Sequence, residues 1–485
     1  MKTITKFIIL SIAALLLLSG CGTYLENPPL KEYQPDKGYR FKNLVTGEKN
    51  KADELFVIMS FSGGGTRAAA LSYGVLEGLQ KANISWQGKQ QTLLDEVDVI
   101  SSISGGSFTA AYYGLKRQAT FNEYLDKFLY RPVQTDLLHL AYNPVNWFKL
   151  AGGSYSRSDL AFEFYNENIF DHATFADLTK LKTRPFISIN ATDLSLGAPF
   201  SFTQEEFDLL CSDLDQVPVA RAVASSSAFP GLLSPLTFKN HDCNKNYPIP
   251  SWVGRALGDR ESGINPRRTN RAENIISYLG KEDYPESEII THWRPYVHLT
   301  DGGVADNIGL RDPLAAMTSV NHPWSIMQLI NKGQIDRLVV IVVNAATNPD
   351  SDRDNTDDVP GLVDTLITAT TIPLDNYSFD TLRLLESAVS DYNEAAKLID
   401  GCEAAAKKAK PACDLKLKRP HHVELYPIVV EFDRIADKDT RRKFKNLPTN
   451  FELPKETIDS LRQVAQQLLE NDRQYKRLMK EIGSK

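Results

Sequence analysis

Two glycine-rich stretches in this chain follow apolar runs and carry residues that could support acyl transfer. Residues 58–77 read IMSFSGGGTRAAALSYGVLE, and residues 97–107 read VDVISSISGGS. In the second stretch, Ser104 lies on a turn between a predicted strand and a predicted helix, where a strained backbone holds the hydroxyl clear of the sheet. Ser102 and Gly106, two residues before and after it, are small enough for such a turn. The spacing predicts a nucleophilic serine, and ordinary loop composition is the alternative.

The first stretch predicts an anion-binding loop. Gly63, Gly64 and Gly65 lie between an apolar run at residues 55–61 and a predicted helix, so their backbone N–H groups can converge on an oxyanion. Each such donor contributes about 3 kcal/mol in the transition state. A phosphate-binding P-loop would need a lysine that is missing here. The glycines and Ala68 also fit a dinucleotide-binding fingerprint. That fingerprint requires an acidic residue on a second strand, however, and this part of the chain is predicted to form a helix and a loop.

A third motif, HLTDGGVADN, supplies a candidate base. Asp301 ends an apolar run at residues 295–300 and precedes Gly302 and Gly303, so its carboxylate can approach another loop closely. An Asp-Gly turn is common by itself. The assignment of Asp301 as a base therefore depends on its combination with Ser104.

Taken together, these motifs resemble those of the patatin-like phospholipases. The resemblance covers residues 53–475, with the motifs in family order, and includes PFISINATDLSLGAPFSFT, VARAVASSSAFPGLLSPL and FKNLPTNFELPKETIDSLRQVAQQLL. It implies that Gly63–Gly65 form the oxyanion hole and that Ser104 attacks the ester with Asp301 as its only partner. The implied activity is that of a lipid acyl hydrolase, acting on phospholipids or lysophospholipids without a cofactor.

The segment SGGGTRA also resembles the glycine loop of the cytosolic calcium-dependent phospholipases. That resemblance implies that Arg67 contacts the phosphate of the substrate, and a structural ion pair is the alternative. Two residues depart from the patatin-like pattern, because Ser102 replaces the first glycine of the elbow and Ala68 replaces a glycine after the arginine. Both are small, so we expect a tightened geometry rather than a lost site.

A Ser-Asp-His triad of the α/β-hydrolase type is the rival mechanism, with His322, His421 or His422 as its third member. His298 is disfavoured, because a residue three positions before Asp301 on one strand faces the other side of the sheet. The nucleophile also follows only the second recognisable strand, whereas the hydrolase elbow comes deeper in the sheet. These points favour a dyad. A non-catalytic lipid-binding lipoprotein is the rival from another class, and the intact serine, aspartate and glycines oppose it.

The N-terminus predicts export and lipid attachment. Lys2 and Lys6 precede an apolar run at residues 7–18, which is too short to span a bilayer and suits a signal peptide. The run ends in Leu-Ser-Gly-Cys, which resembles a bacterial lipobox and implies that Cys21 is the lipidated first residue of the mature chain. Because Gly22 follows it, the resemblance favours the outer membrane. We therefore expect a lipid-anchored protein of the bacterial cell envelope that faces the periplasm.

Composition excludes some partners. The 55 basic residues fall to 53 without Lys2 and Lys6, against 61 acidic residues, so the formal net charge moves from −6 to −8. This balance opposes a nucleic-acid partner. The acidic segment Asp350–Asp358 begins like a calcium loop, but Asn355 stands where glycine is needed and Gly361 where the loop needs a bidentate glutamate. We therefore expect no metal site there.

The order of apolar runs predicts an α/β fold, with a mostly parallel central sheet, helices on both faces and helical C-terminal additions. Strands are expected at residues 55–61, 97–103, 186–191, 295–300, 337–344 and 424–432. The predicted divisions are a signal peptide at 1–20, the lipidated Cys21 and an extended tether at 21–52, and a patatin-like domain at 53–485 with a core at 55–345 and a C-terminal strand and helices at 346–485.

Four cysteines follow Cys21, and an even number in an exported chain suggests disulfides. Of the three possible pairings we favour Cys211–Cys243 and Cys402–Cys413, because each closes a short loop, and GCEAAAKKAKPACD suits a stapled hairpin. Buried free thiols are the alternative.

A last predicted helix begins near Pro454. It places Ile458, Leu461, Ala465 and Leu468 on one face, which favours core packing over a membrane-lying face.

Overall fold

The computed structural model describes residues 24–44, 54–151, 153–241, 247–259, 266–279, 293–347, 362–408 and 421–483. The predicted signal peptide, the lipobox with Cys21, and the Asp350–Asp358 segment lie outside these ranges. Cys243 and Cys413 also lie outside them.

The centre of the molecule is an eight-stranded sheet with the order β10-β9-β1-β4-β5-β8-β7, in which β6 also pairs with β5. The strands from β10 to β5 run parallel. The strands of the chain are β1 (Leu55–Phe61), β2 (Asn83–Trp86), β3 (Lys89–Thr92), β4 (Val97–Ile103), β5 (Phe186–Asp193), β6 (Ala198–Ser201), β7 (Leu236–Lys239), β8 (Tyr296–Thr300), β9 (Arg337–Asn344) and β10 (Glu424–Glu431). The predicted α/β class and mostly parallel sheet are confirmed.

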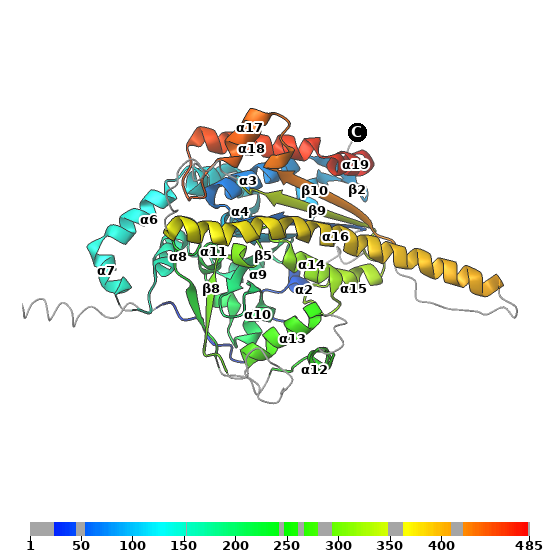
Figure 1. The fold of residues 1–485 in the computed structure, drawn as a ribbon, viewed down its shortest axis with the longest axis horizontal. Coiled ribbons are helices and arrows are strands. Elements are labelled where there is room, and N and C mark those ends of the chain that lie inside the picture. Colours follow the sequence, from blue (N-terminus) through cyan, green and yellow to red (C-terminus); the bar gives the residue numbers. More distant parts are fainter. Residues whose placement is uncertain are drawn as a thin grey trace, which may run out of the picture.

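Helices lie on both sides of this sheet, with α3, α17, α18 and α19 on one side and α14 and α15 on the other (Figure 1). The α-helices are α2 (Phe41–Leu44), α3 (Gly65–Lys81), α4 (Gly105–Lys116), α5 (Thr120–Tyr124), α6 (Val133–Tyr142), α7 (Pro144–Leu150), α8 (Arg157–Asn168), α9 (Phe175–Leu181), α10 (Gln204–Leu209), α11 (Val219–Ser226), α12 (Ser251–Gly258), α13 (Pro266–Leu279), α14 (Arg311–Thr318), α15 (Ile326–Asn331), α16 (Leu362–Lys408), α17 (Lys438–Lys445), α18 (Lys455–Asn471) and α19 (Arg473–Ile482). The predicted C-terminal helix is α18, and its apolar face is buried in the core.

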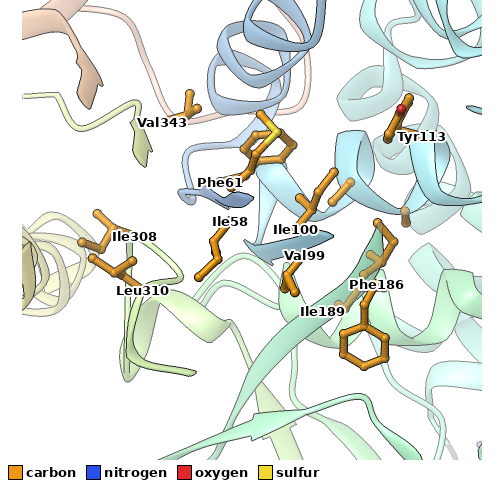
Figure 2. Close-up of a cluster of buried hydrophobic side chains, with 14 of the residues drawn as sticks. Ile58, Phe61, Val99, Ile100, Tyr113, Phe186, Ile189, Ile308, Leu310 and Val343 are labelled. Carbon is orange, nitrogen blue, oxygen red and sulfur yellow. The ribbon is translucent and has the colours of Figure 1, made fainter. Parts of the chain in front are cut away.

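The core forms where the central strands meet these helices. Every residue of β1, β4 and β5 is buried, as expected for strands covered on both faces. Figure 2 shows Ile58 of β1, Val99 of β4 and Ile189 of β5 in this cluster, with Ile308 and Leu310 from the loop after β8. Because the loop after β8 is part of the core, its position relative to the ends of β1 and β4 is held by packing.

The direction of β8 is a finding that the sequence did not reveal. β8 runs antiparallel to β5 and pairs with it through only two residues, Thr300 with Thr192 and Leu299 with Asp193. The two strands therefore overlap only at their C-terminal tips. This overlap brings the residue after β8, Asp301, to the edge of the sheet at which the parallel strands end. The strands β2, β3, β6 and β7 were also not predicted.

The predicted tether requires a correction. Residues 24–44 have little helix, but they pack against the domain instead of leading away from it. Asn27 Nδ2 donates to Ser212 Oγ at 2.9 Å, and the buried ring of Tyr39 stacks on Phe186 with 4.9 Å between ring centroids. Aromatic side chains of this segment gain more from burial than from an extended, solvated conformation.

The predicted Cys402–Cys413 disulfide is wrong, because Cys402 is a free, exposed thiol. It lies on α16, which continues to Lys408 and replaces the expected hairpin. A helix moves the chain away from Cys402 by about 1.5 Å per residue. Cys211 is disulfide-bonded, and since Cys243 lies outside the described residues, the pairing between these two stays a prediction.

None of the helices in the described ranges combines the length and apolar character needed to cross a membrane.

Candidate active site

Ser104 lies on a strained turn between β4 and α4, as its sequence context predicts. Its φ and ψ angles are 49° and −121°, a conformation that L residues rarely adopt and that costs on the order of 1–3 kcal/mol. The two following glycines make the turn possible. A Cβ on Gly105 would lie 2.0 Å from the carbonyl oxygen of Gly65, and one on Gly106 would lie 2.7 Å from that of Ser62. The turn that carries Ser104 therefore packs directly on the glycine loop.

Asp301 approaches this turn from the tip of β8. Ser104 Oγ donates a hydrogen bond to Asp301 Oδ2 at 2.8 Å. The other carboxylate oxygen, Oδ1, accepts the backbone N–H of Gly303 at 2.7 Å. Both side chains are nearly buried, with exposed fractions of 7% for Ser104 and 4% for Asp301. The structure thus brings together the serine and the carboxylate that the sequence singled out, across 197 residues of chain.

Burial raises the pKa of Asp301 to about 6, while the hydrogen bonds from Gly303 N–H and Ser104 Oγ oppose this rise. A carboxylate with a raised pKa is a stronger base than an ordinary aspartate and is still ionised at neutral pH. The position of Asp301 therefore suits the removal of a proton from the serine hydroxyl.

The glycine loop offers two of the three expected donors. The N–H of Gly63 is already donated to the carbonyl oxygen of Asn307 at 2.9 Å, which corrects the expectation that all three glycines face the substrate. Within the described ranges, the N–H groups of Gly64 and Gly65 have no acceptor. Gly64 precedes α3 and has a φ of 132°. Since Ser104 likewise precedes α4, two helix N-termini meet here and favour negative charge.

The guanidinium of Arg67 lies beside Gly64 and is held by hydrogen bonds within the protein. Its side chain is buried, and Nε donates to the carbonyl oxygen of Ala345 at 2.9 Å. Nη1 donates to the carbonyl oxygens of Leu447 and Pro448 at 2.8 and 2.9 Å, and Nη2 donates to Thr449 Oγ1 at 3.1 Å. At least four of the five guanidinium donors are thus used inside the protein. These hydrogen bonds give Arg67 a structural role, through carbonyl oxygens and a hydroxyl and not through the ion pair that was considered as the alternative.

The segment that Arg67 holds, residues 447–453, is here called the C-terminal strap. Its Asn450 carbonyl oxygen accepts the N–H of Thr66 at 2.8 Å, and a Cβ on Gly65 would lie 2.1 Å from that same oxygen. Phe451 packs near Phe108, with 5.7 Å between ring centroids. The C-terminal strap therefore supports the glycine loop from behind, which the sequence did not indicate.

Ser226, at the end of α11, is a second residue that sequence reasoning missed. Its Oγ accepts the N–H of Ser104 at 2.8 Å and donates to the carbonyl oxygen of Asn190 at 2.6 Å. Ser107 Oγ lies 3.0 Å from the same hydroxyl. This contact fixes the backbone of the strained turn. In the sequence, Ser226 was marked only by its place in a run of three serines. That run lies in the segment VARAVASSSAFPGLLSPL, which resembles the patatin-like phospholipases.

Two of the three histidines considered for a triad, His322 and His421, pair with carboxylates elsewhere in the protein. His322 is buried, and its Nε2 lies 3.0 Å from Asp312 Oδ1. His421 pairs with Asp336, and His298 with Thr237. No histidine in the described ranges hydrogen-bonds to either member of the serine–aspartate pair, and no three potential metal ligands gather there. In the described part of the chain, Ser104 and Asp301 thus form a hydrogen-bonded pair that no histidine joins.

A model of the patatin-like phospholipase family matches residues 59–314, which include the glycine loop, the turn that carries Ser104, and the aspartate. The match covers more than half of the chain, and the chain belongs to the patatin-like phospholipase family.

Comparison with solved structures finds distant similarity. Human GIVD cytosolic phospholipase A2 shares 14% identity over 62% of this chain and 45% of that chain, with a TM-score of 0.33. VipD from Legionella pneumophila shares 11% identity over 86% of this chain and 67% of that one, with a TM-score of 0.27. The chain thus spans less than half of the human protein. No curated protein sequence matched this chain.

Proposed function

We propose that this protein is a lipid acyl hydrolase that uses Ser104 as nucleophile and Asp301 as base, without a histidine. The observation that carries the proposal is the 2.8 Å hydrogen bond between Ser104 Oγ and Asp301 Oδ2 on a strained strand-to-helix turn. The substrate class follows from the family, whose described activity is that of a phospholipase. Phospholipids or lysophospholipids of a membrane are the proposed substrates.

In the proposed reaction, Ser104 Oγ attacks the carbonyl carbon of a fatty-acyl ester while its proton passes to Asp301. The tetrahedral oxyanion accepts hydrogen bonds from the N–H groups of Gly64 and Gly65. When the intermediate collapses, the bond to the alcohol breaks and Asp301 returns the proton to the leaving oxygen. Water then attacks the acyl-enzyme and gives a proton to Asp301. When this second intermediate collapses, the bond between Ser104 Oγ and the acyl carbon breaks, Asp301 passes the proton to Ser104 Oγ, and the fatty acid leaves.

The direct test combines an active-site probe with three variants. A fluorophosphonate should label the native protein on Ser104. Ser104→Ala and Asp301→Asn should each lower turnover by several orders of magnitude, and the double variant should be little worse than either, because the pair acts as a unit. His322→Ala, His421→Ala and His422→Ala serve as controls and should keep most activity. Full activity in Ser104→Ala would exclude this nucleophile, and a folded histidine variant as inactive as Ser104→Ala would restore the triad.

The location of the protein is part of the proposal. The lipobox-like sequence supports lipid attachment at Cys21 and residence in a bacterial outer membrane, facing the periplasm. Cys21→Ser should leave an unprocessed or soluble protein that no longer fractionates with outer membrane. Unchanged processing and fractionation of this variant would exclude the anchor.

A further inference from the structure

The helices α6 and α7 carry large apolar side chains that no other part of the described structure covers. Tyr142, Val145 and Trp147 are 72%, 68% and 55% exposed, and Leu138 lies one turn before Tyr142 and is also exposed. Trp147 Nε1 donates to the carbonyl oxygen of Ala141 at 3.0 Å, so the indole lies against the end of α6. These four exposed side chains, together with the ends of α6 and α7 that carry them, are here called the apolar tip.

The apolar tip is connected to the active site at its base. Gln134 and Thr135, in the first turn of α6, hydrogen-bond to Phe451 and Glu452 of the C-terminal strap. The C-terminal strap in turn contacts the glycine loop. Because α6 begins at these contacts with the C-terminal strap and spans ten residues, it extends about 15 Å away from them. In Figure 1, α6 and α7 project from the side of the molecule.

Further exposed apolar residues follow, along the chain, the segments that hold Asp301. Val304 follows Asp301 by three residues, and Leu232 lies in the loop after Ala228, whose carbonyl oxygen accepts the N–H of Asp301. That loop is fastened to the start of α8, because Ser234 N–H donates to Ser158 Oγ at 3.1 Å. Since α8 also packs against α6, the loop that carries Leu232 is joined through α8 to the helix that carries the apolar tip.

The N-terminal segment reaches the same region. The described chain starts at Tyr24, three residues after Cys21, and the guanidinium of Arg221 lies over the rings of both Tyr24 and Phe162 of α8. The neighbouring Leu25 is exposed. The described chain thus begins, at Tyr24, beside the helix that also holds the loop of Leu232.

The charges of the apolar tip fit a lipid surface. Residues 137–150, LLHLAYNPVNWFKL, contain no acidic residue and one lysine, whereas charged residues make up 24% of the chain. Lys149 pairs with Glu163 at 3.2 Å. In an acidic protein, this segment thus brings no acidic side chain of its own to the apolar tip. Tryptophan and tyrosine are the residues that favour the boundary between lipid headgroups and acyl chains.

We propose that the apolar tip docks on a phospholipid bilayer and sets the active-site rim against it. This inference rests on the proposed function, because a lipid substrate gives the docking its purpose. The insertion of Tyr142, Val145 and Trp147 would complement the acyl anchor at Cys21, since multiple attachments hold a protein to a membrane more firmly than one.

The test measures binding to vesicles made of equal parts of phosphatidylethanolamine and phosphatidylglycerol. The full-length chain carries Cys21→Ser, which removes the anchor, and Ser104→Ala, which prevents hydrolysis, so that binding is separated from activity. Adding Tyr142→Ser and Trp147→Ser should weaken co-sedimentation with vesicles at least tenfold. The matched control, Val320→Ser with Leu398→Ser, removes two exposed apolar side chains elsewhere and should change binding less than twofold.

Val145→Asp provides a second variant in case the double variant fails to fold. An acidic residue in the first turn of α7 is favourable for the helix, so the fold is retained while negative charge enters the apolar tip. It should also weaken vesicle binding at least tenfold. Unchanged binding in this folded variant overturns the proposal. A change from dimer to monomer with unchanged vesicle binding would assign the tip to a second copy of the chain and overturn it as well.

Enzymatic activity distinguishes this inference from the proposed function. With Ser104 intact, Val145→Asp should lower hydrolysis of vesicle phospholipid about tenfold and leave hydrolysis of a dissolved short-chain ester within twofold. Equal loss on both substrates would contradict docking. If the protein with Ser104 intact hydrolyses neither substrate, the proposed function fails, while the vesicle-binding result stands by itself.

Discussion

The chemistry of the site depends on a few atoms around Ser104. Its positive φ directs the hydroxyl toward Asp301 and away from the sheet, and the contact from its backbone N–H to Ser226 holds the turn in that conformation. The close approach to Gly65 requires that Gly105 lack a side chain, and the close approach of the Asn450 carbonyl oxygen requires the same of Gly65. The strained backbone of Ser104 thus places its hydroxyl within hydrogen-bonding distance of the Asp301 carboxylate.

The raised pKa of Asp301 predicts a shifted pH profile. Burial raises its pKa to about 6, and a base must be ionised to act, so kcat/KM should be constant above about pH 7 and fall about tenfold per unit below about pH 6. The measurement is kcat/KM on a dissolved short-chain ester, so that membrane binding does not contribute.

Asp306 provides the control for this profile. It is also buried, and burial raises its pKa to about 6 as well, but it accepts the N–H of Arg311 and does not touch the nucleophile. Asp306→Asn should keep the acid limb. An acid limb near pH 4 in the parent protein, or its disappearance in Asp306→Asn, would contradict the assignment of this pKa to Asp301.

At the scale of elements, the site is assembled from one antiparallel and two parallel strands. β1 and β4 deliver the glycine loop and Ser104 to the same edge, because they run parallel and Phe61 pairs with Ser102. β8 supplies Asp301 from the opposite direction. The C-terminal strap then supports the glycine loop through Arg67. Each of these contacts joins segments that are distant in sequence.

Arg67 is therefore expected to act as a positioning residue. A lysine cannot reproduce its fork of hydrogen bonds to Ala345, Leu447 and Pro448. Arg67→Lys should lower the free energy of unfolding by about 2 kcal/mol and kcat by about tenfold, equally on phospholipid and on an uncharged short ester. Thermal or denaturant unfolding and steady-state kinetics on both substrates measure these effects.

Two further variants, Thr449→Ala and Arg473→Lys, serve as comparisons for Arg67→Lys. Thr449→Ala removes one of the contacts of Arg67 and should produce a smaller loss of the same kind. Arg473 is exposed on α19, and its replacement by lysine should have no effect. If Arg67→Lys impairs only the hydrolysis of phospholipids, the head-group role is correct after all.

At the scale of the whole molecule, the C-terminal part belongs to the same sheet as the core. β10 pairs with β9 along all eight of its residues, from Glu424 with Arg337 to Glu431 with Asn344. The predicted boundary between the core and the C-terminal part, at residue 345, thus separates strands of one sheet. The long helix α16 carries the chain between them.

The cysteines provide a prediction at this scale. Cys402 is exposed and free, so it should react with iodoacetamide in the native, unreduced protein. Cys211 is disulfide-bonded and should react only after reduction. Peptide mapping by mass spectrometry before and after reduction measures both. A reducible peptide that joins Cys402 to Cys413 would contradict the structure and restore the stapled hairpin.

The sequence alone determined the local parts of the site. Apolar runs predicted β1, β4 and β9 to within a residue, because a strand buried on both faces is apolar throughout. The positions of Ser104 and Asp301 at strand ends followed from the glycines beside them, since the backbone freedom of glycine is a local property. The family resemblance rested on the same motifs.

Only the tertiary structure decided which groups these residues meet. The partners of Arg67 lie up to 382 residues away, and the use of the Gly63 N–H by Asn307 depends on how the loop after β8 packs. The pKa of Asp301 depends on its burial, which many segments create together. The exposure of Tyr142 and Trp147 was equally undecided, because an apolar helix has the same sequence whether a core or a membrane covers it.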